Sequence, residues 1–144
     1  MKSEPNTYSI DDLIKDNTTQ WEGVRNYQAR NFMRDDMKIG DHVLFYHSNT
    51  KPPGIVGLAE VCKESYPDHF AWDVSSKYFD PKSSPENPIW MMVDVKFKKK
   101  LNHPISLDTL KTYPELETML VIKRGMRLSI QPVEKQHFEF ITSL

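Results

Sequence analysis

The sequence predicts an α+β fold in which a curved, barrel-like sheet of mixed strands is flanked by short helices. Segments with strand patterning lie far apart along the chain, and helical segments separate them. The length of 144 residues is that of one domain. No internal repeat, low-complexity tract or Gly/Ser linker divides the chain, so we expect residues 1–144 to form a single domain.

Four segments have strand patterning. Residues 42–47 are rich in β-branched and aromatic side chains, and a Pro-Pro-Gly turn separates them from residues 55–61. Residues 89–97 predict a third strand, in which Val93, Val95 and Phe97 alternate with Asp94 and Lys96 as a half-buried strand requires, and residues 128–131 predict a short late strand. The core residues expected from these strands are Val43, Phe45, Val56, Leu58, Val93, Val95 and Leu128.

Three segments predict helices. Residues 9–14 combine a serine N-cap, two acids in the first turn and apolar residues at i, i+3, i+4 spacing. Residues 26–36 predict a second helix, and a closing helix begins after Pro132. Residues 66–88 form a long irregular stretch that is rich in aromatic side chains, which indicates an ordered and functional loop.

Composition limits the function classes. A formal charge of -1 argues against binding nucleic acid by phosphate charge alone, so local geometry would have to do more. The single cysteine, Cys62, excludes an intrachain disulfide and a thiolate-rich zinc site, and the five histidines lack metal-ligand spacing. We therefore expect no metal and no cofactor.

The expected location is cytoplasmic, or nuclear in a eukaryote, because no secretory signal or apolar run of about 20 residues is present. Enzymatic signatures are absent too: there is no Gly-x-Ser-x-Gly elbow, no glycine-rich phosphate loop and no zinc-deaminase pattern. We expect a monomer that performs no catalysis and has no catalytic residue.

The most informative segment is Trp21–Asn31, which gathers an aromatic plate, a glycine, two arginines and several side-chain amides. A pocket for a nucleobase needs stacking rings and hydrogen-bonding amides or hydroxyls, while arginine binds phosphate. The alternative is structural: Trp21 would fill the core, Asn26 would cap a helix, and Arg25 and Arg30 would face solvent. Composition alone favours neither interpretation.

Several further motifs, in this order and spacing, resemble the signatures of the EVE domain family along nearly the whole chain. They are Lys2-Ser3-Glu4-Pro5, Trp21–Asn31, Phe45-Tyr46-His47-Ser48-Asn49, Pro53–Gly57, Tyr66-Pro67-Asp68, Trp72-Asp73, Tyr78–Ser83, Pro88-Ile89-Trp90, Arg124-Gly125 and Arg127–Val133. Two positions depart from the pattern. The chain begins at Met1-Lys2, where many relatives have a preceding apolar strand, and Val74 follows Trp72-Asp73 where proline is frequent.

The resemblance implies a PUA-like β-barrel related to YTH domains, and a non-catalytic module that binds a flipped, modified cytosine or adenine, chiefly in DNA. Carried over by motif, the base-binding pocket would draw on Ser3, Trp21, Val24, Asn26, Tyr46 and His47, with Ser129 and Gln131 near its rim. Arg25 and Arg30 would contact the nucleic-acid backbone.

Three other functions stay open. An RNA-binding PUA-like domain would need a wide basic track and contacts to 2′-hydroxyls. A base-processing enzyme would need a carboxylate beside the base, for which Glu4 and Glu22 are the candidates. A protein-interaction domain would need a large exposed apolar patch.

Overall fold

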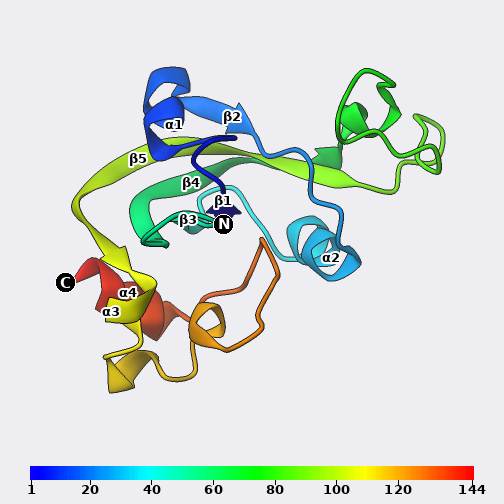
Figure 1. Cartoon of the computed structure of the whole chain (residues 1–144). Helices are drawn as coiled ribbons and strands as arrows, with labels where there is room; N and C mark the ends of the chain where they lie inside the picture. Colours follow the sequence, from blue (N-terminus) through cyan, green and yellow to red (C-terminus); the bar gives the residue numbers. More distant parts are fainter.

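The computed structural model describes all 144 residues and is built on a five-stranded mixed sheet with the strand order β1-β3-β4-β5-β2 (Figure 1). The strands are β1 (Lys2–Ser3), β2 (Thr18–Gln20), β3 (His42–His47), β4 (Gly54–Pro67) and β5 (Met91–Ser106). β1 runs parallel to β3, and all other pairs are antiparallel. This arrangement agrees with the predicted fold class.

The two long strands give the sheet its curvature. The register between β4 and β5 shifts at four places, and each β-bulge increases local twist and bends the strand. Both strands accordingly sweep across the molecule as curved ribbons, and the segment that joins them projects beyond their ends (Figure 1). The sheet therefore coils toward a barrel around one side of the molecule.

The helices follow local capping signals. α1 (Ile10–Asp16) begins with a capping box between Ser9 and Asp12, and the Asn26 side chain caps α2 (Tyr27–Asp35). The remaining helical elements are α3 (Leu107–Leu110), α4 (Lys135–Thr142) and the 3₁₀ turns η1 (His69–Trp72), η2 (Pro114–Leu116) and η3 (Leu120–Ile122). None of the helices has the length and apolar character needed to cross a bilayer.

Two apolar clusters pack on opposite faces of the sheet. Val43 and Phe45 of β3 contribute to the larger cluster with α1 and α2, whereas Leu44 and Tyr46 contribute to the smaller one. In Figure 1 the second face is covered by the C-terminal part of the chain, coloured yellow to red. Five of the seven predicted core residues are buried: Val43, Phe45, Val56, Val93 and Val95.

The other two core predictions need correction. Leu58 is half-buried and packs against the smaller cluster, because the sheet is covered on both faces. Leu128 is half-buried and Ile130 is the buried residue of its segment, since residues 128–131 do not form the predicted strand. A single bond joins this segment to β1, from Lys2 N to Ser129 O at 2.8 Å. The two-residue β1 is too short to extend that pairing, and Pro132 has no N–H to donate.

Candidate nucleic-acid interface

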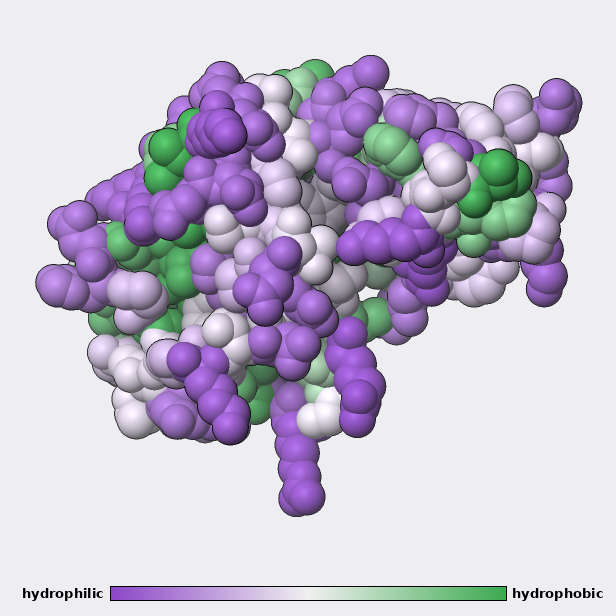
Figure 2. Space-filling model, turned by 45° about the horizontal axis from the view of Figure 1, so that its top comes forward, coloured by the Kyte–Doolittle hydropathy of each residue, from purple (hydrophilic) through white to green (hydrophobic).

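A cleft of about 630 Å³ opens where β1, the connection from β2 to α2, and the irregular segment 68–88 meet. Its volume lies within the ~300–1,000 Å³ of typical small-molecule sites. Figure 2 shows a mainly hydrophilic face with a hollow near its centre, beside the lobe that segment 68–88 forms. The cleft is lined by Lys2, Ser3, Glu4, Thr7, Tyr8, Thr19, Gln20, Trp21, Glu22, Gly23, Val24, Ser48, Lys77, Tyr78, Arg127 and Ser129.

Trp21 is held at the inner wall of the cleft by the sheet. β2 pairs with β5, and the next residue continues the contact because Trp21 N donates to Val93 O at 2.8 Å. The indole packs edge-to-face on Phe45, with ring centroids 5.6 Å apart, and is only 8% exposed. The indole N–H has no hydrogen-bond partner within the protein. Because every fully buried side-chain nitrogen has a partner, this N–H must be accessible to solvent. Trp21 is thus both a core residue and part of the cleft wall.

Asp68 organises the outer wall. This fully buried carboxylate accepts hydrogen bonds from Gly23 N at 2.9 Å, Arg25 Nη1 at 3.0 Å and Phe70 N at 3.0 Å. It therefore fastens the connection from β2 to α2 onto η1. Gly23 has φ +85, and a Cβ there would lie 2.5 Å from the Tyr78 ring, so glycine allows that ring to pack against the turn.

The two arginines predicted to contact the nucleic-acid backbone are both engaged within the protein. Arg25 pairs with Asp68 and donates through Nη2 to Tyr78 O at 2.7 Å. Arg30 donates through Nη1 to Ile89 O at 3.0 Å, and its guanidinium lies 4.9 Å from the Tyr27 ring centroid. Arg25 thus ties Asp68 to the middle of segment 68–88, and Arg30 holds the residue that follows the segment.

The cationic rim comes from other residues. Lys77 and Arg127 line the cleft with exposed side chains, and Lys2 lines it with a half-buried one. Burial lowers the pKa of Lys2, whose Nζ donates to Met126 O at 3.3 Å. The cleft is thus lined by three aromatic rings (Tyr8, Trp21 and Tyr78), three cations and two carboxylates (Glu4 and Glu22).

The eight residues predicted for the base-binding pocket divide into two sets. Ser3, Trp21, Val24 and Ser129 line the cleft together. The other four lie elsewhere: Asn26 caps α2 through a bond from Ala29 N, His47 Nε2 accepts from Ile10 N at 3.1 Å, and Tyr46 and Gln131 line a different pocket.

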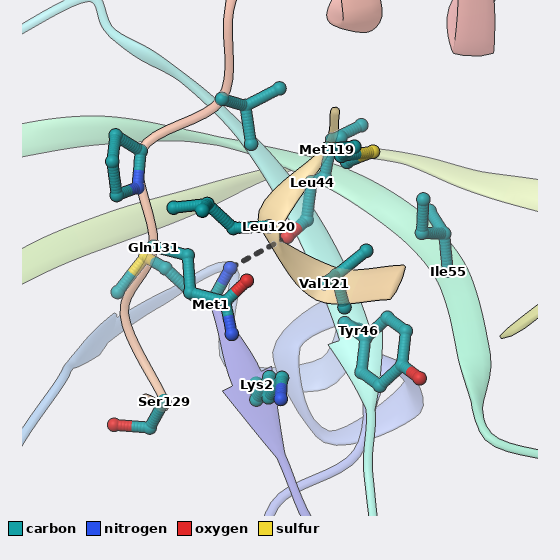
Figure 3. Close-up of a pocket in the computed structure, with 12 residues that line it drawn as sticks. Met1, Lys2, Leu44, Tyr46, Ile55, Met119, Leu120, Val121, Ser129 and Gln131 are labelled. Carbon is teal, nitrogen blue, oxygen red and sulfur yellow. Dashed lines mark hydrogen bonds between the residues drawn. The ribbon is translucent and has the colours of Figure 1, made fainter. Parts of the chain in front are cut away.

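That second pocket is too small for a base. Its volume is about 30 Å³, roughly the share of one water molecule in the liquid. Figure 3 shows Tyr46 and Gln131 around it with Leu120 and Val121 of η3, and the bond from Met1 N to Leu44 O at 2.8 Å. Tyr46 is part of the smaller apolar cluster, and Gln131 Nε2 donates to Leu128 O at 2.7 Å, so both have structural contacts outside the cleft.

Sequence reasoning missed several residues of the cleft. Four of them lie in segments that no sequence pattern placed beside Trp21: Tyr8, Lys77, Tyr78 and Arg127. In the sequence, Asp68 also looks like any other acidic residue of a loop. The Tyr66-Pro67-Asp68 motif was the available signal for Asp68, but sequence spacing gave no indication that its carboxylate faces Gly23 and Arg25. No group of three or more His, Cys, Asp or Glu side chains is arranged to hold a metal ion.

The family model of the EVE domain matches residues 1–144. The chain belongs to the EVE domain family. Thymocyte nuclear protein 1 of Rattus norvegicus is 46% identical over an alignment that covers 100% of this chain and 71% of that protein. The Homo sapiens protein of the same name is 44% identical, and the alignment covers 100% of this chain and 72% of the human protein.

Solved structures resemble this EVE domain along its whole length. A Leishmania major protein is 50% identical with a TM-score of 0.94, and the match covers 99% of this chain and 90% of that one. The human THYN1 protein, crystallised in complex with DNA containing 5-methylcytosine, is 44% identical with a TM-score of 0.93. The match covers 99% of this chain and 94% of the human one. These likenesses confirm the predicted PUA-like α+β fold.

The His47 contact predicts a pH-dependent stability. Burial lowers the pKa of this imidazole from 6.5, while the neighbouring Asp11 raises it and Lys100 lowers it. Its Nε2 accepts from Ile10 N, so protonation breaks that bond. The unfolded chain takes up the proton first as the pH falls below 6.5, and the stability present above this pH is lost toward the lower pKa of the folded state.

We therefore expect the free energy of unfolding, measured by urea titration between pH 7.5 and 5, to fall more steeply in the wild type than in His47→Gln. The glutamine amide can accept the same hydrogen bond without titrating. Identical slopes for the two proteins would show that His47 does not titrate differently on folding.

Proposed function

We propose that this EVE domain binds DNA and holds a modified base, flipped out of the helix, in the cleft beside Trp21 without changing it chemically. The observation that carries the proposal is the cleft itself, with a volume of about 630 Å³ and a lining that includes the rings of Trp21 and Tyr78 and the cations Lys77 and Arg127. A 44% identical relative crystallised with DNA containing 5-methylcytosine supports DNA as the ligand.

The chemistry of the cleft suits a base on a phosphate backbone. A flipped base needs an aromatic or apolar surface to replace the lost stacking, and Trp21, Val24 and Tyr78 supply one. Its polar edge needs hydrogen-bonding groups, which include the Ser3 and Ser129 hydroxyls. We assign Asn26, Tyr46, His47 and Gln131 to positioning of the walls.

The backbone contacts are assigned from the rim. We assign the phosphate contacts to Lys2, Lys77 and Arg127, because Arg25 and Arg30 are engaged by Tyr78 O and Ile89 O within the protein. The cleft is formed within one chain, so we propose a monomer as the binding unit. The relatives named nuclear proteins support a nuclear site of action if the source is eukaryotic.

A binding panel tests the proposal. Fluorescence anisotropy would compare labelled DNA duplexes that differ at one position, carrying cytosine, 5-methylcytosine, adenine or N6-methyladenine, with single strands and the matching RNA. We expect DNA with one of the modified bases to bind most tightly, and log K to fall with log salt by ~0.9 for each phosphate contact. Lys77→Ala should weaken all duplexes alike and reduce that slope.

Two results would contradict the proposal. Equal binding of modified and unmodified DNA would remove base recognition, and tighter binding of RNA would favour the RNA-binding alternative. The recovered DNA should be intact, because no chemical step is proposed. Release of free base or strand scission, abolished by Glu4→Gln or Glu22→Gln, would indicate a base-processing enzyme.

A further inference from the structure

Glu22 is an unusual residue to find in a cleft for a polyanion. It lies between Trp21 and Gly23, is half-buried, and lines the cleft. Burial raises the pKa of its carboxyl, a hydrogen bond from its own backbone N–H lowers it, Asp68 raises it, and Lys77 and His69 lower it. Neither Lys77 nor His69 forms an ion pair with it, in contrast to the Arg25 pairing with Asp68. Its carboxylate is therefore partly desolvated and forms no ion pair, which leaves it free to accept a further hydrogen bond.

Such a carboxylate opposes DNA binding unless the ligand supplies a hydrogen-bond donor to it. A carboxylate repels DNA phosphates, and partial burial adds a desolvation penalty that a hydrogen-bond donor offsets. An ionised carboxylate only accepts hydrogen bonds. Cytosine and adenine carry a donating exocyclic amine at C4 and C6, whereas thymine and guanine present a carbonyl oxygen at the corresponding positions.

We propose that Glu22 is the specificity-determining residue of the cleft, and that its carboxylate accepts a hydrogen bond from the exocyclic amine of the flipped base. This inference rests on the proposed function of the same cleft. Glu22 selects amino-bearing bases such as cytosine and its 5-methyl derivative, and it rejects thymine because two acceptors would face one another. The 5-methyl group itself is read by the apolar wall and not by Glu22.

The matched pair of 5-methylcytosine and thymine tests this inference, because both carry the 5-methyl group and they differ on the edge that pairs. Each base would be placed opposite an abasic site in an otherwise identical duplex, so that flipping breaks no base pair in either. Anisotropy titrations would give the ratio of the two affinities. For the wild type we expect 5-methylcytosine to bind more tightly by about tenfold or more.

Glu22→Gln should bring this ratio close to one. The glutamine amide can rotate to donate to a carbonyl or to accept from an amine, so 5-methylcytosine loses affinity and thymine does not. Glu22→Asp keeps the charge and should retain a preference for 5-methylcytosine, which provides a second variant if the first folds poorly. Glu115→Gln removes the same charge from η2, outside the cleft lining, and should leave the ratio unchanged.

The outcomes separate the inference from the function on which it rests. A wild type that prefers 5-methylcytosine, with the same ratio in a folded Glu22→Gln variant, overturns the role of Glu22 and leaves the cleft as a base-binding site. If the wild type binds duplexes with cytosine, 5-methylcytosine and thymine equally, the proposed base recognition by the cleft is itself contradicted. A wild type that prefers thymine overturns the inference directly.

Discussion

Replacing Asp68 by alanine is expected to lower the free energy of unfolding by about 3–5 kcal/mol, as removal of one partner from a buried ion pair typically does. The carboxylate is fully buried, and it satisfies the guanidinium of Arg25 and the backbone N–H groups of Gly23 and Phe70. Alanine leaves the N–H groups of Gly23 and Phe70 without an acceptor and removes the ion-pair partner of Arg25, which keeps only its bonds to backbone carbonyls. Urea titration followed by circular dichroism would measure the loss.

Asp68→Asn provides the graded comparison. Its carboxamide oxygen can still accept from a backbone N–H, so the loss should be smaller than for alanine. Asp35→Ala is the surface control, because Asp35 pairs with Arg34 in an exposed ion pair of the kind that contributes little. If Asp68→Ala were as stable as Asp35→Ala, the buried carboxylate would not be what fastens the cleft wall to η1.

Replacing Trp21 by alanine should have two large effects. The side chain is 8% exposed and packs on Phe45, so its truncation should lower the free energy of unfolding by about 3–5 kcal/mol. The same change removes the stacking surface, worth ~1–3 kcal/mol per base, and should abolish the preference for the modified base. Binding would be measured at low temperature, where the folded fraction is established by circular dichroism.

Trp21→Phe separates the two effects. Phenylalanine keeps an aromatic ring against Phe45, so most of the stability should remain. Its smaller ring offers less area for stacking, so the preference for the modified base should decrease. Lys77→Ala supplies the contrast, since a phosphate contact acts on all sequences alike. Full discrimination by Trp21→Ala would show that this tryptophan is only a core residue, and would move the search for the pocket to Trp72 and Trp90.

Helix caps and strand patterning in the sequence predicted the elements that depend mainly on neighbouring residues. Residues 42–47 form β3 as predicted, and the caps at Ser9 and Asn26 start α1 and α2. β1 and β2 have two and three residues, too few for an alternating pattern to be visible. The predicted strand at 128–131 failed for a reason outside its own residues, because its neighbour β1 is too short to pair with it.

The site was less predictable than the fold, because its walls come from distant segments. Ser3, Trp21, Val24 and Ser129 were predicted to share a pocket and do line one cleft, but that cleft also depends on Asp68. Arg25 shows the limit of residue-type reasoning. An arginine beside an aromatic residue suits phosphate binding by sequence, and only the fold reveals a buried carboxylate opposite it.

The most direct test of the central claim is the response of the three tryptophan indole N–H resonances to DNA. Trp21 lines the cleft and its N–H has no partner within the protein, whereas the N–H of Trp90 donates to Asp80 Oδ2 at 2.7 Å. Titration of a ¹⁵N-labelled sample with a duplex containing one 5-methylcytosine should shift the Trp21 resonance, and the unmodified duplex should shift it much less. Shifts confined to Trp72 or Trp90, or equal shifts with both duplexes, would contradict a base-binding cleft beside Trp21.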